Sequence, residues 1–209
     1  MKFVILLIVG MVMLISGNLA AQQVNRLWNY DTDKAGTNAS GFTNKKGKWE
    51  VVADSGAFSS PNVLAQMAEN SGSTFNMTLH DEACGKDVKV SVMMKSVSGN
   101  EDQGGGLVWR AKDTSNYYIA RYNPLEDNFR VYKVVNGQRI NLQSSDIKHS
   151  EGWHKLKVKM TGDHIECYYD EKKYLDVTDS TFQDSGKIGL WTKADAVTYF
   201  DDLVFQESK

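Results

Sequence analysis

A repeat of two residues runs through the centre of the chain and constrains its fold more than any other feature. In residues 117–122 and again in residues 129–135, aromatic and β-branched side chains recur at every second position. Successive side chains of a β-strand point to opposite faces of a sheet, so this period predicts strands. Asn136 and Gly137 follow, and both tolerate the positive φ of a tight hairpin. Because Pro124 has no N–H for the ladder, the first strand ends before it. This region is predicted to be an antiparallel meander.

Further strands are predicted by similar alternation, separated by short turns. They cover residues 27–30, 49–53, 63–68, 74–80, 87–97, 155–160, 164–169, 174–177, 186–192 and 197–206. Residues 63–68 suit either a helix or a strand, and Pro61 before them favours the strand. No long segment after the N-terminal region has a helical period of 3.6 residues. The predicted fold class is all-β, a jelly roll or β-sandwich of two antiparallel sheets.

Composition limits the domain count and the class of partner. The chain has 209 residues, 41% of them hydrophobic, which suits one domain with a sizeable core. The 24 basic and 26 acidic residues give a formal net charge of −2. Without a basic surplus, nucleic acid is not an expected partner.

Residues 1–21 have the features of a signal peptide. Lys2 supplies a positive charge, and residues 3–15 form an apolar run that is short for a membrane span. Small residues follow, so cleavage is expected near Ala21 and Gln22. The alternative is an uncleaved N-terminal anchor. The prediction is an exported protein, periplasmic or extracellular, with one domain at 22–209 and no membrane segment after cleavage.

Two cysteines, Cys84 and Cys167, remain in the mature chain. An exported protein could join them in a disulfide. Cys167 is in phase with Ile165 and Tyr169, which favours a buried free thiol. We expect two free cysteines, at least one of them buried.

No catalytic motif is evident, so the catalytic residues are unknown from sequence. The chain lacks a Gly-x-Ser-x-Gly motif, a His-Glu-x-x-His motif and a phosphate loop. Glycoside hydrolysis needs two carboxylates across one bond, and no strand carries such a pair. If the protein is an enzyme, the candidate groups are Glu126, Asp195, Arg110 and Arg121. Whether it is an enzyme is left open.

Binding of a sugar is better supported, because flat aromatic rings stack on sugar faces while polar side chains hydrogen-bond the hydroxyl groups. The candidate ligand-binding residues are Trp109, Arg110, Tyr118, Arg121, Trp191, Lys193 and Asp195. Arg110 and Arg121 lie on neighbouring predicted strands and could contact one anionic group. The alternatives are that the tryptophans belong to the core and that the arginines form surface ion pairs. The expected partner is an oligosaccharide or glycan.

Asp201 and Asp202 stand together in the last predicted strand. Adjacent residues of a strand point to opposite faces, so one of the two carboxylates is expected to face inward or towards a sheet edge. A buried carboxylate needs a partner, either a basic group or a cation.

Four segments resemble the concanavalin A-like lectin/glucanase superfamily. They are GGLVWR at 105–110, WHKL at 153–156, GLWTKAD at 189–195 and YFDD at 199–202. The chain is similar to exported bacterial proteins of the 3-keto-disaccharide hydrolase family, and laminin G-like modules share the same jelly roll. The resemblance implies two curved sheets with ligands on the concave one. It also implies a structural calcium at Asp202 or Asp201.

The Glu-x-Asp-x-x-Glu catalytic strand of family 16 glycoside hydrolases is absent. The strand at 118–121 also lacks the acidic residue of the keto-sugar family. The sequence therefore predicts an exported carbohydrate-binding or surface-interaction β-sandwich. The alternative is a glycoside or 3-keto-sugar hydrolase or lyase of the same fold. The sequence specifies neither the sugar nor the oligomeric state.

Overall fold

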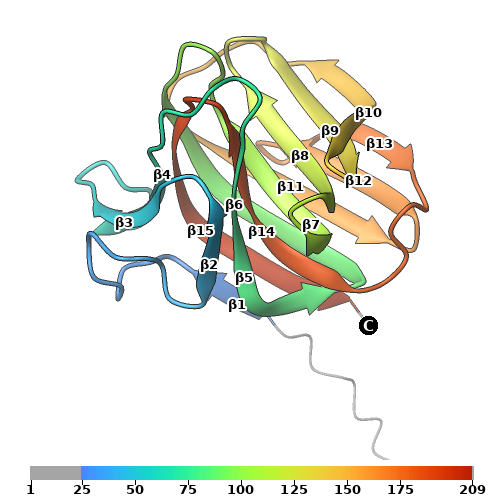
Figure 1. Cartoon of the computed structure of the whole chain (residues 1–209), viewed down its shortest axis with the longest axis horizontal. Coiled ribbons are helices and arrows are strands. Elements are labelled where there is room, and N and C mark those ends of the chain that lie inside the picture. The colour runs from blue at the N-terminus through green and yellow to red at the C-terminus, as the bar shows by residue number, and fades with distance from the viewer. Residues whose placement is uncertain (1–24, 209) are drawn as a thin grey trace, which may run out of the picture.

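Two antiparallel sheets pack face to face in a computed structural model that describes residues 25–208 (Figure 1). The eight-stranded sheet has the order β13 (Lys172–Thr178), β12 (His164–Tyr169), β11 (Trp153–Thr161), β6 (Asp87–Ser98), β15 (Val197–Ser208), β4 (Asn62–Gln66) and β3 (Trp49–Ala53), with β1 (Asn25–Trp28) paired to β15. The seven-stranded sheet has the order β10 (Gln138–Asp146), β9 (Asn128–Val135), β8 (Asn116–Asn123), β7 (Gly105–Asp113), β14 (Gly186–Lys193), β5 (Phe75–Gly85) and β2 (Phe42–Lys46). The predicted all-β sandwich is confirmed. The predicted signal peptide at 1–21 lies outside the described residues.

The central meander is also confirmed. Strands β7 to β10 are consecutive neighbours in the seven-stranded sheet. Asn136 and Gly137 have φ of 50° and 80°, and they join β9 to β10 with Val135 opposite Gln138. Strand β8 ends at Asn123, directly before the proline. The turn chemistry visible in the sequence therefore sets the register of these strands.

Residues 62–66 form strand β4, so proline at 61 does precede a strand. Two strands, β2 and β10, were not predicted. They form the two edges of the seven-stranded sheet, and their sequences FTNKK and QRINLQSSD are largely polar and exposed. Edge strands have one free side, so they need little of the apolar alternation that marks a central strand.

The main core lies between the sheets, and a second apolar cluster covers the other face of the seven-stranded sheet. The core cluster joins Val90 and Leu156 of one sheet to Leu107 and Ala120 of the other. The second cluster contains Phe75, Met77, Leu79, Val108, Ala111, Tyr117, Ile119, Tyr132, Val134 and Trp191, all of which lie on the seven-stranded sheet. We call the face that carries this cluster the outer face.

Cys167 is buried and Cys84 is exposed, and the two thiols are not bonded to each other. Burial raises the pKa of the Cys167 thiol well above its usual range. The prediction of free cysteines, at least one buried, is confirmed. Across residues 25–208 there is no helix long and apolar enough to cross a membrane.

Candidate functional site

The register of the seven-stranded sheet determines which side chains share the outer face. Residues paired across antiparallel strands point to the same side. One row of such pairs contains Lys46, Met77, Trp191, Gly106, Arg121 and Arg130. A neighbouring row contains Thr43, Leu79, Gly189, Val108, Ile119, Tyr132 and Asn141. The first row therefore adds three cations to an otherwise apolar surface.

Arg139 of β10 lies across three aromatic rings of this face. Its guanidinium carbon is 4.6 Å from the ring centroid of Tyr132, 5.3 Å from that of Phe75 and 5.8 Å from that of Trp191. These distances are within the range of a cation–π interaction. We call the rings of Phe75, Tyr132 and Trp191 the aromatic floor. Tyr117 supports it, because its hydroxyl accepts a hydrogen bond from Trp191 Nε1 at 3.2 Å. Burial raises the pKa of Tyr117 to about 12, so its hydroxyl is neutral at ordinary pH.

A cluster of polar groups adjoins the aromatic floor. Arg121 is 1% exposed and donates to Glu126 Oε2 at 2.9 Å, to Asn128 Oδ1 at 3.1 Å and to the Tyr132 hydroxyl at 3.3 Å. Arg130 donates to the same Glu126 oxygen at 3.2 Å and to the same hydroxyl at 3.4 Å. Burial opposes ionisation of Glu126, but the hydrogen bonds from Arg121 and Asn128 outweigh it and lower its pKa to about 2.

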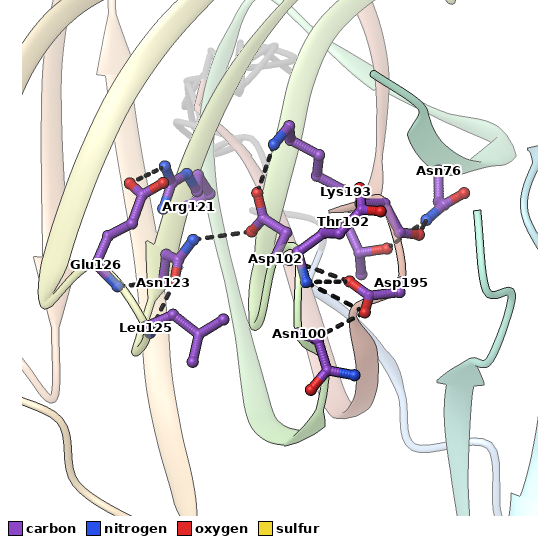
Figure 2. A network of polar contacts seen from close by, with 12 residues as sticks. Asn76, Asn100, Asp102, Arg121, Asn123, Leu125, Glu126, Thr192, Lys193 and Asp195 are labelled. Atoms are coloured by element: carbon purple, nitrogen blue, oxygen red, sulfur yellow. Dashed lines mark hydrogen bonds and ion pairs between the residues drawn. The ribbon is translucent and has the colours of Figure 1, made fainter. Parts of the chain in front are cut away.

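Lys193 enters this arrangement from the side of β14, as Figure 2 shows. Its Nζ donates to Asp102 Oδ2 at 2.9 Å, and Asp102 Oδ1 accepts from Asn123 Nδ2 at 2.8 Å. Asn123 Oδ1 in turn accepts from the backbone N–H of residues 125 and 126. The network fixes the turn that carries Glu126 beside Arg121.

Asp195 lies beyond this network in the turn after β14. Its carboxylate accepts hydrogen bonds from the backbone N–H of Asn100 at 2.7 Å and of Asp102 at 3.0 Å (Figure 2). Burial alone would raise the pKa of Asp195, but these backbone hydrogen bonds outweigh burial and lower the pKa. Asp195 lines a 630 Å³ cavity between loops together with Glu69 and Glu101. The lining of this cavity includes none of the three rings of the aromatic floor, so Asp195 holds a loop in place outside the floor.

Two of the aromatic candidates, Trp109 and Tyr118, are in the core between the sheets. Both are 0% exposed, and their rings stack with centroids 5.5 Å apart. Trp109 Nε1 donates to Met160 Sδ at 3.1 Å, and the Tyr118 hydroxyl donates to Asp179 Oδ1 at 2.6 Å. These positions correspond to the core alternative of the sequence analysis.

Arg110 connects three loops through hydrogen bonds and does not contact Arg121. A register shift in β7 follows Trp109, and Arg110 itself has a φ of 46°. The guanidinium donates at 2.7 Å to each of three backbone carbonyls, those of Lys86, Gly162 and Phe182. Burial lowers the pKa of this guanidinium. The two arginines thus have separate partners, and the structure does not place them on one anionic group.

Asp201 is the inward-facing member of its pair, with 0% exposure, while Asp202 is partly exposed. The expected basic or cationic partner is replaced by Ser59, whose backbone N–H and hydroxyl donate to Asp201 at 2.7 and 3.0 Å. Burial raises the pKa of Asp201 to about 6. Among the described residues no group of three or more acidic, histidine or cysteine side chains is placed to hold a metal ion. Because Ca²⁺ takes about six to eight oxygen ligands, these two side chains supply too few on their own. Calcium at this position stays a prediction.

Sequence reasoning missed several outer-face residues, namely Lys46, Phe75, Arg130, Tyr132 and Arg139. A signal for one of them was present. With Asn136 and Gly137 as the hairpin turn, Arg139 pairs with Val134, which places it on the side of Tyr132. Of the predicted ligand-binding residues, the structure brings Arg121, Trp191 and Lys193 together on or beside this face.

Searches against known proteins find a likeness of structure only. No protein-family model matches the chain, and no curated protein matches it. The carbohydrate-binding module CBM66 from Bacillus subtilis superposes with a TM-score of 0.68 at 22% identity, over 83% of this chain and 98% of that chain. The Crh5 transglycosylase gives a TM-score of 0.65 at 12% identity, covering 88% and 85%. The exoplasmic/lumenal domain of VIP36, in its Ca²⁺/Man3GlcNAc-bound form, gives 0.58 at 12% identity, covering 83% and 86%. The chain has the concanavalin A-like lectin/glucanase fold, in the form of a β-sandwich like that of a carbohydrate-binding module.

Proposed function

We propose that the protein is an exported carbohydrate-binding module whose ligand lies on the outer face of the seven-stranded sheet. The observation that carries the proposal is the combination of an aromatic floor with hydrogen-bonding groups on one face. Phe75 is the partly exposed ring of the floor, while Tyr132 and Trp191 are 4% and 1% exposed, and Arg139 lies over all three. A hollow of 240 Å³ beside Phe75 and Met77 gives a ligand room next to these groups. Sugar sites typically combine an apolar floor with a few convergent polar groups.

Carboxylate chemistry also favours binding over hydrolysis. A general acid for glycoside cleavage needs a raised pKa. The pKa of Glu126 is lowered to about 2, and that of Asp195 is lowered as well. Both carboxylates are held by donors from the chain itself. The alternative, a hydrolase or lyase for glycosides or 3-keto-sugars, would need another acid on this face.

A glycan array followed by calorimetry with the mature protein tests the proposal. Arg130→Ala should weaken binding of the selected glycan at least tenfold, because the 35% exposed Arg130 side chain lies on the outer face. Lys89→Ala, on the eight-stranded sheet, should leave the affinity unchanged. Unchanged binding in Arg130→Ala would place the ligand elsewhere. Release of product from the same glycan would favour the enzyme alternative.

Export is part of the proposal and has its own test. Residues 1–21 are expected to be removed, leaving Gln22 as the first residue. The intact mass of the protein recovered from the periplasm or medium should correspond to residues 22–209. Recovery of the full-length mass from membranes would instead support the uncleaved anchor.

A further inference from the structure

The outer face carries more positive than negative charge. Arg121 and Arg130 share a single carboxylate, because both donate to Oε2 of Glu126. Lys46 adds a further cation, at the edge of the 240 Å³ hollow that also contains Lys45 and Phe75. The protein as a whole is slightly acidic, with a formal net charge of −2. The excess of cations is therefore a property of this face.

Among the described residues neither Arg139 nor Lys46 forms an ion pair, and Arg139 lies instead against aromatic rings. Within residues 25–208 the Arg139 side chain makes no hydrogen bond, and its guanidinium carbon lies 4.6 to 5.8 Å from the centroids of the three aromatic rings. Its Nη1 is buried without a hydrogen-bond partner. Arg121 Nε is buried and unpartnered in the same way. A donor on a charged group is costly to leave without an acceptor. Arg121 is 1% exposed and out of reach of a ligand, whereas Arg139 is partly exposed, so an anionic ligand can supply the acceptor that Arg139 lacks.

Tyr132 connects the two guanidiniums. The guanidinium carbon of Arg121 is 5.8 Å and that of Arg139 is 4.6 Å from its ring centroid. Its hydroxyl accepts from Arg121 and Arg130. The three arginines are thus grouped around one ring.

We propose that the outer face selects acidic glycans, and that the partly exposed Arg139 and Arg130 bind the carboxylate of a uronic acid residue or the sulfate of a sulfated sugar. The planar guanidinium fork fits either oxyanion with paired hydrogen bonds. Phe75, the partly exposed ring of the aromatic floor, then packs against the sugar ring that carries the charge. This inference rests on the proposed carbohydrate-binding function and specifies its ligand class.

The test compares tetragalacturonate with its methyl ester, because the two share a sugar skeleton and differ in charge. Calorimetry with the mature protein at low salt should show at least a tenfold preference for the acid. The preference should fall as salt screens the charges. A sulfated tetrasaccharide, such as one from chondroitin sulfate, separates sulfate from carboxylate recognition.

Arg139→Gln should reduce the preference for the acid towards one, whereas Lys89→Gln, which removes the same charge from the opposite sheet, should leave it intact. Arg130→Gln provides a second variant if Arg139→Gln does not fold, as judged by its melting curve. Equal binding of acid and ester, or an equal loss of preference in Lys89→Gln, would overturn the inference. Neutral glycans bound at this face with no preference for acids would leave the proposed function standing. No binding of any glycan would remove both.

Discussion

Replacing Arg110 with methionine should destabilise the protein severely, although Arg110 was first a candidate for ligand binding. The side chain is 1% exposed and donates at 2.7 Å to the carbonyl oxygens of Lys86, Gly162 and Phe182. A hydrogen bond to a charged donor contributes about 1.5–3 kcal/mol, and each buried carbonyl left without a donor adds a penalty. Water entering the adjacent 270 Å³ cavity should recover part of this loss. We therefore expect a loss of about 3–5 kcal/mol.

Urea denaturation of the mature protein measures this loss directly. For a domain of this size each kcal/mol lowers Tm by about 2–4 °C, so the melting temperature should fall by about 10 °C. Lys112→Met is the matched control, because Lys112 is exposed and, within the described part of the chain, its one ion pair is with the exposed Asp184 at 3.4 Å. The control should lie within about 0.5 kcal/mol of the wild type. A loss below about 1 kcal/mol in Arg110→Met would refute the conclusion that Arg110 stabilises the fold by connecting three loops.

Three further predictions concern Asp179, the two cysteines and Asp202. Burial alone would raise the pKa of Asp179, but hydrogen bonds from Lys133 and Thr181 outweigh burial and lower the pKa to about 2. Ionised Asp179 therefore contributes about 2 kcal/mol to the free energy of unfolding, and this contribution is complete above pH 4 and lost as the pH falls towards 2. Asp179→Asn should flatten that part of the pH–stability curve measured by urea titration. A thiol reagent should modify one cysteine, Cys84, in the native protein and a second only in urea, because Cys167 is buried; two fast thiols would contradict its burial. If calcium binds beside Asp202, the melting temperature should rise with Ca²⁺ and fall with EDTA, and Asp202→Asn should remove the shift; identical melting curves would exclude this site.

The strand positions follow largely from local chemistry. Alternation of side chains defined most of the strands, and the Asn136–Gly137 turn fixed the hairpin that carries Arg139. The adjacent Asp201 and Asp202 also behaved as the geometry of a strand requires, with one carboxylate buried. These features depend on residues that are close in sequence, so the sequence is sufficient to predict them.

The partners of the charged groups could not be predicted in this way. Ser59, which holds Asp201, is 142 residues away in sequence. A register shift after Trp109 turns Arg110 towards three loops. Such contacts depend on how distant segments meet, and a pattern of local alternation contains no information about that.

The amino-acid sequence determined that this chain forms a sandwich of antiparallel strands. It also showed that Tyr118 and Arg121 point to opposite sides of one strand, since their separation is an odd number of residues. Only the tertiary structure decided which side is the core and which is the outer face. Both sides of β8 are apolar, with Tyr118 and Ala120 on one and Tyr117 and Ile119 on the other. When both sides carry several apolar residues, alternation alone does not indicate which one the second sheet covers, and the packing of the two sheets settles it.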